Sequence, residues 1–76
     1  MSEMEWLKIF GDNLAYLLAK NGMSQIDLAE RAGLTQATIS RYISARQLPG
    51  VRAIINIAHV LGLSIDELID FGDMIE

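Results

Sequence analysis

The chain has 76 residues with one proline and no cysteine. A domain of this size typically buries only about 60–65 % of the surface of its unfolded chain, which excludes a two-domain enzyme, and the missing cysteines exclude disulfides and thiolate sites. Residues of the AVILMFWYC class make up 51 % and charged residues 21 %, too apolar a balance for disorder. No apolar run approaches the roughly 18 residues of a membrane span, so we expect a single soluble, cytoplasmic domain over residues 1–76.

The net charge of −4 is unevenly distributed along the chain. Between Arg31 and Ile65 there are four arginines and no acid, a local charge of +4, whereas the other segments hold all ten acids and two lysines, a charge of −8. A cationic middle between acidic ends is typical of a surface that binds an anion. Four arginines are also an ordinary density for this length, so the pattern alone leaves chance open.

The first two predicted helices are marked by their apolar spacing and their ends. The first spans about residues 5–20, stops at Asn21 and Gly22, and repeats apolar residues at three- and four-residue steps. These are Leu7, Phe10, Leu14, Leu17 and Leu18. The second begins after the N-cap Ser24, which has Asp27 three residues on as an acidic relative of the capping box, and runs up to Gly33. Its expected apolar contacts are Ile26, Leu28, Ala29 and Ala32.

The third predicted helix is capped by Thr35 and runs to about Ile43, so only Gly33 and Leu34 separate it from the second. Two short helices joined by a glycine-bearing turn have the layout of a helix-turn-helix, in which the second helix enters the DNA major groove. This spacing over about residues 24–43 is a weak sign by itself, because many small helical proteins contain such a corner.

Two further helices complete the predicted fold. A loop containing Pro49 leads to a fourth helix, which stops at Gly62. Its expected shared face is Val51, Ile54, Ile55, Ala58 and Leu61. Ser64 and Glu67 form a capping box that opens a fifth helix, which fades at Gly72. The fifth helix is expected to bury Ile65, Leu68 and Ile69. No stretch alternates like a strand, so the predicted class is a compact, all-α, five-helix domain.

One face of the third helix is polar and carries no carboxylate. At 100° per residue, five residues fall within an arc of about 140°. They are Gln36, Ala37, Ser40, Arg41 and Ser44. Glutamine can pair with adenine, arginine with guanine, and an alanine methyl can contact thymine. A helix face that is merely solvated would more often include Glu or Lys, so this composition favours base recognition.

The helix ends and core positions agree with one sequence pattern. It reads Ser24-Gln25-x-x-Leu28-Ala29-x-x-Ala32-Gly33-Leu34-Thr35-x-x-Thr38-Ile39-Ser40-Arg41, then Pro49, then Ile57-Ala58-x-x-Leu61-Gly62-x-Ser64-x-Asp66-Glu67-Leu68. From about residue 10 to 69 the chain resembles the lambda-repressor-like, Xre and Cro class of helix-turn-helix regulators. The resemblance implies a sequence-specific transcription regulator of bacterial or phage type, expected to be a repressor, that binds a pseudo-palindromic double-stranded DNA operator as a homodimer.

The resemblance also implies roles for nine DNA-binding residues. Gln25 matches a position that bonds a phosphate and braces the recognition helix. Base-facing positions hold Gln36, Ala37 and Arg41, and positions that reach bases or phosphates hold Thr38 and Ser40. The backbone-contacting loop begins at Ser44, Arg46 and Gln47. The position of Arg41 on its helix suits guanine or the flanking phosphate equally well, and a contact by Arg52 is left open.

The chain departs from the family pattern at a few positions. Ala45 stands where the family most often has glycine, so either a left-handed turn there costs roughly 1 kcal/mol or the helix ends differently. Ile43 and Leu48 replace residues that are usually polar, as core edge or as an exposed patch. The apolar and acidic tail, residues 71–76, either packs back on the domain or contributes to a dimer.

No enzyme, metal, cofactor or small-molecule site is evident. The single histidine, His59, is expected to be exposed and lacks a second His or Cys partner. Asp66 and Glu67 lie at a helix start, where acids favour the dipole, rather than at calcium-loop spacing. Like charges near the fifth helix predict a homodimer that is weak without DNA. The competing hypothesis is a protein-interaction module, such as an antitoxin-like partner, that keeps this fold.

Overall fold

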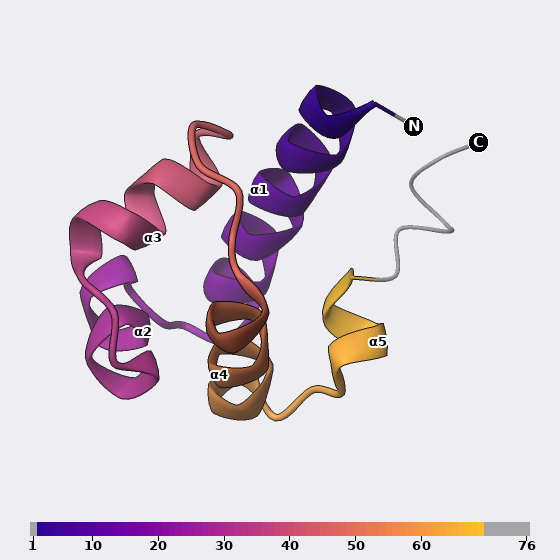
Figure 1. Cartoon of the computed structure of the whole chain (residues 1–76). Helices are drawn as coiled ribbons and strands as arrows, with labels where there is room; N and C mark the ends of the chain where they lie inside the picture. The colour runs from indigo at the N-terminus through magenta and orange to yellow at the C-terminus, as the bar shows by residue number, and fades with distance from the viewer. Residues whose placement is uncertain (1, 70–76) are drawn as a thin grey trace.

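The computed structural model describes residues 2–69, and within them the chain forms five α-helices (Figure 1). They are α1 (Glu3–Lys20), α2 (Gln25–Ala32), α3 (Gln36–Ile43), α4 (Val51–Leu61) and α5 (Ile65–Ile69). The all-α, five-helix prediction is therefore confirmed. The tail over residues 71–76 lies outside the described residues.

Side-chain caps begin the helices at the predicted serines. The Oγ of Ser24 accepts the Asp27 N–H at 3.0 Å, and the Asp27 carboxylate accepts the Ser24 N–H at 3.2 Å. The bond from the Ser24 backbone N–H, and next the Ser24 hydroxyl, hold the pKa of the Asp27 carboxyl below its ordinary value. Ser64 and Glu67 form the same pair, with the same effect on the pKa of Glu67. A third capping box at Ser2, which was not predicted, starts α1 two residues earlier than expected.

Left-handed residues end both helices of the helix-turn-helix. Gly33 ends α2 with a φ of 70°, and Ala45 follows α3 with a φ of 61°. At Ala45 the N–H of Arg46 reaches back to the carbonyl of Arg41 at 2.8 Å, which is the long bond of a Schellman motif. Of the two alternatives at position 45, the chain therefore forms the left-handed turn despite the alanine side chain.

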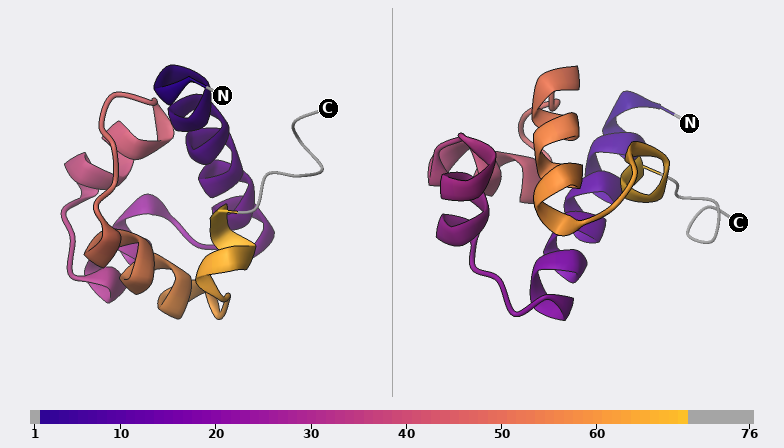
Figure 2. Two further views of the ribbon diagram at one scale, coloured as in Figure 1. Left: turned by 45° about the vertical axis from the view of Figure 1, so that its right-hand side comes forward. Right: turned by 90° about the horizontal axis from the view of Figure 1, so that it is seen from below.

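The core fills the space enclosed by the five helices. Its fully buried large side chains are Phe10, Leu14, Leu28, Ile39, Ile57 and Leu68. The ring of Phe10 meets Tyr42 edge-on, with 6.3 Å between centroids, and so joins α1 to α3. Across all three views α2 and α3 lie on one side of the molecule and α5 on the other (Figures 1 and 2). Helix α3 packs against α1 and α2, on the side of the molecule away from α5.

The prediction of which face of α4 is buried in the core is partly wrong. Val51 and Ile55 are 75 % and 43 % exposed, while Ala53 and Ile57 are buried. The buried arc is rotated toward Asn56, whose Nδ2 donates to the last carbonyl of α2 at 3.2 Å. This bond and the packing of α2 against α4 decide which apolar side of α4 faces inward.

The structure also decides whether four further apolar side chains are buried or exposed. Ile26, an expected apolar contact, and Ile65, which was expected to be buried, are 49 % and 41 % exposed, so neither belongs to the buried core. Each lies in the first turn of its helix, before the acid of the capping box. Ile43 is half-buried at the edge of the core, whereas Leu48 is 53 % exposed.

Candidate nucleic-acid interface

Helix α3 separates buried from exposed side chains as the sequence predicts. Ile39 and Tyr42 are 0 % and 3 % exposed. The exposed residues form what we call the polar strip: Gln36, Ala37, Ser40, Arg41 and Ser44. Because the strip contributes no buried side chain, its hydrogen-bonding groups are available to a ligand that lies along α3.

Arg41 does not project freely from the strip. Its Nε donates to Oε1 of Gln47 at 2.6 Å, and its Nη2 donates to Oγ1 of Thr38 at 3.3 Å. Thr38 itself is half-buried at the edge of the strip, and its hydroxyl pairs with that of Thr35 at 2.9 Å. The structure therefore brings three of the predicted site residues, Thr38, Arg41 and Gln47, into one hydrogen-bonded group.

The remaining predicted site residues flank this group. Ser44 donates its hydroxyl hydrogen to the carbonyl of Ser40 at 2.9 Å, so its oxygen is left as an acceptor until the hydroxyl rotates. Arg46 is exposed in the loop after α3, and Gln25 is half-buried at the first position of α2. Ser44 ends the strip and Gln25 and Arg46 lie beside it, and none of the three bonds to the guanidinium of Arg41.

The strip lies in a segment of the chain whose only charged residues are arginines. No acid occurs between residues 31 and 65, and α3 has neither an acid nor a lysine. Arg31, Arg41, Arg46 and Arg52 are all exposed. The strip therefore lies in the cationic part of an acidic protein, which suits a polyanion.

A glycine of α1 sets how closely α3 approaches. A Cβ added at Gly11 would lie 2.6 Å from the backbone oxygens of both Tyr42 and Ile43. Since real Cβ atoms do not come so close to backbone, only glycine allows α1 to touch the end of α3. Sequence reasoning missed this positioning role, although a lone glycine inside an otherwise amphipathic helix is a sign of close backbone packing.

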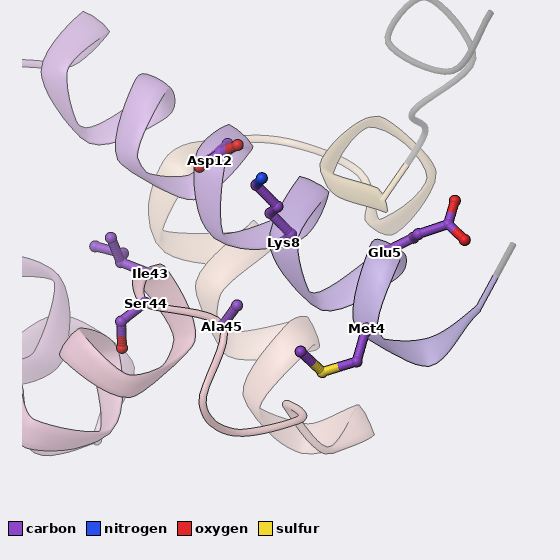
Figure 3. A pocket seen from close by; sticks show the side chains of 7 residues that line it. All are labelled: Met4, Glu5, Lys8, Asp12, Ile43, Ser44 and Ala45. Atoms are coloured by element: carbon purple, nitrogen blue, oxygen red, sulfur yellow. The ribbon is translucent and has the colours of Figure 1, made fainter.

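A pocket of about 450 Å³ lies between the first half of α1 and the end of α3 (Figure 3). It is lined by Met4, Glu5, Lys8, Asp12, Ile43, Ser44 and Ala45. Side chains of α1 face the last turn of α3 across it, and they carry charges of both signs. The pocket shares only Ser44 with the polar strip, so the pocket and the strip are largely different surfaces.

Neither a cluster of metal-ligand side chains nor a membrane-spanning helix was found in the described part of the chain. Within residues 2–69 no three His, Cys, Asp or Glu side chains gather closely enough to hold a metal ion. His59 is exposed on α4. None of the helices in this part of the chain combines the length and apolar character needed to cross a membrane.

Comparison with known proteins assigns the chain to a family. The HTH_3 helix-turn-helix family model matches residues 14–68, which include α2, α3 and the polar strip. The chain belongs to the HTH_3 family. Its resemblance to Xre and lambda-repressor-like regulators is thereby confirmed, and it is a DNA-binding protein of the transcription-regulator class, which is not a class of enzymes.

Relatives of the HTH_3 chain are similar over most of its length. It is 32 % identical over 66 residues to the uncharacterized HTH-type transcriptional regulator y4dJ of Sinorhizobium fredii, covering 87 % of this chain and 86 % of that protein. The restriction-modification controller protein C.AhdI from Aeromonas hydrophila shares 27 % identity and a TM-score of 0.79, covering 82 % and 94 % of the two chains. An HTH_3 regulator from Vibrio cholerae, at 16 % identity, shares the fold with a TM-score of 0.86 over 96 % of this chain and 41 % of its own.

Proposed function

We propose that this protein is a sequence-specific transcriptional regulator of the repressor type that places α3 in the major groove of its operator. The observation that carries the proposal is the polar strip, an exposed face without carboxylates on the second helix of a helix-turn-helix. A helix in this position presents its exposed side chains to base edges. The amide, hydroxyl, methyl and guanidinium groups of the strip suit those edges.

The polar strip and its flanks divide the work of recognition. Gln36, Ala37 and Arg41 contact base edges, and Thr38 and Ser40 reach bases or the nearest phosphates. Gln25, Ser44, Arg46 and Gln47 contact the sugar–phosphate backbone on either side. Backbone contacts fix the register and supply most of the affinity, whereas base contacts supply sequence choice.

Selection of duplexes from a random pool, followed by Gln36→Ala, tests this proposal. We expect one sequence to be enriched, and Gln36→Ala to lose about 1–3 kcal/mol on it with little change on random DNA. Asp66→Asn, on α5 across the molecule, is the control and should leave the ratio of the two affinities unchanged. Failure to enrich any sequence would favour a protein-interaction module, and equal losses on both DNAs would show that Gln36 does not read bases.

Two copies of the chain act together on DNA in this proposal. One recognition helix covers only about four to six base pairs, too few to single out an operator among roughly 10⁶ genomic competitors, so half-sites about one helical turn apart are needed. Support for a pairing surface on α4 and α5 comes from the exposed aliphatic residues Val51, Ile55 and Ile65. Acids on α5 keep the free dimer weak, and DNA that spans both half-sites stabilises it.

Sedimentation of the protein alone and with a two-half-site duplex measures this assembly. We expect mostly monomer without DNA and two copies per duplex with it. Val51→Ser should weaken pairing, whereas Tyr16→Ser, at the similarly exposed Tyr16 of α1, should not. One copy per duplex at saturating protein would contradict the dimer.

A further inference from the structure

Neighbouring side chains hold the guanidinium of Arg41 at two points. Gln47 accepts from its Nε at 2.6 Å and Thr38 accepts from its Nη2 at 3.3 Å. The Thr38 hydroxyl is in turn paired with Thr35, the N-cap of α3, at 2.9 Å. The four side chains connect the start of α3, its middle and the loop that follows it.

The turn at Ala45 brings Gln47 to this place. Along a continuing helix, residue 47 would lie about 9 Å further up the axis than residue 41. Instead the left-handed Ala45 reverses the chain, and the N–H of Arg46 binds the carbonyl of Arg41 at 2.8 Å. Gln47 follows directly, half-buried, with its amide oxygen toward the guanidinium.

The two contacts leave a defined part of the guanidinium open. The group has five N–H donors in one plane, and two of them are used by Gln47 and Thr38. Nη1 has no partner among residues 2–69, so its end of the fork is free. A pair of acceptors lying in that plane, such as O6 and N7 of guanine, matches this end. A phosphate can also accept from both N–H groups of this end, and an Arg41→Ala variant that changes no base preference would reveal that contact.

We propose that Gln47 is a specificity-determining residue that acts through Arg41, by holding the guanidinium in the plane in which it reads a guanine. This rests on the proposed function and adds to the backbone contact proposed there, because Oε1 of Gln47 holds Arg41 while its Nε2 can still donate to a phosphate. Holding a long side chain before binding removes an ordering cost that corresponds to about a 2- to 10-fold change in affinity. That gain applies to the matching base, so losing Gln47 should lower discrimination at one base pair by about this factor.

The test compares binding of the full chain to its selected duplex and to all single-base variants of that duplex. Arg41→Ala first identifies the base pair at which discrimination depends on Arg41. Gln47→Ala should lower discrimination at that base pair alone, and in the double variant it should add nothing further. Gln47→Glu keeps an acceptor for Nε and should retain the discrimination, although its charge lowers affinity for every duplex. Thr38→Val removes the second acceptor and should act like Gln47→Ala.

Asn21→Ala is the matched control, since it removes an exposed side-chain amide at the end of α1, outside the Arg41 group and the proposed DNA contacts, and should leave discrimination at that base pair intact. Circular dichroism checks that each variant is folded. Equal losses on all duplexes with Gln47→Ala would overturn the proposal, as would an Arg41→Ala variant that changes no base preference. These results differ from failure of the proposed function, in which the unsubstituted chain selects no sequence.

Discussion

Replacing Ala45 by glycine should stabilise the protein. With φ at 61°, Ala45 holds a left-handed conformation that costs a residue with a Cβ about 1–2 kcal/mol. Glycine removes this cost but loses about 0.5–1 kcal/mol more conformational entropy on folding. The expected net gain is therefore about 0.5–1 kcal/mol, which corresponds to a rise in Tm of about 2–8 °C for a domain of this length.

Thermal and urea unfolding of Ala45→Gly and two controls would measure this gain. Gly62 has a φ of 70° and open space where a Cβ would go, so Gly62→Ala should lose about 1 kcal/mol through the same conformational cost. Ala19 is exposed in the last turn of α1, and Ala19→Gly should lose up to about 1 kcal/mol through helix propensity. If Ala45→Gly is destabilising like Ala19→Gly, position 45 does not carry the strain inferred from its φ.

Further predictions concern packing, salt and pH. Gly11→Ala should destabilise the protein by about 1–3 kcal/mol in urea unfolding, because α1 and α3 must separate; an unchanged midpoint would contradict the close contact. DNA affinity should fall steeply with salt, with a log–log slope of several units, despite the net charge of −4; a flat response in titrations from low to high salt would oppose phosphate binding by the arginines. The lowered pKa values of Asp27 and Glu67 mean that their stabilising effect is present above about pH 4 and is lost as the pH falls through the folded-state values. NMR titration should find both carboxyls below their ordinary pKa, and Ser24→Ala should raise that of Asp27 alone.

Helix positions could be predicted because their signals are local. Ser24, Thr35 and Ser64 bond to the helix that each precedes, and glycines 33 and 62 end α2 and α4 in the left-handed conformation. The polar strip followed from the same logic, since α3 has few apolar residues and only one way to bury them. Each of these features depends on residues within four positions of one another.

Contacts between distant segments could not be predicted in the same way. Eight of the eleven residues of α4 are apolar, so periodicity could not choose between Val51 and Ala53, and the bond from Asn56 to α2 makes that choice in three dimensions. The bond from Arg41 to Gln47 depends on the path of the loop, which the alanine at position 45 left open. Contact of the nine predicted site residues with DNA remains a prediction.

The residues that anchor α3 in the core are not the residues that form its polar strip. This separation bears on how recognition of new operators arises. Ile39 and Tyr42 anchor the helix, while Gln36, Ala37 and Ser40 form no part of the core. A substitution in the strip can therefore redirect the protein to another DNA sequence without lowering its folding stability. No second mutation is then needed to restore that stability. The same domain can diversify by single steps, and a library confined to these three positions is a practical route to regulators with new targets.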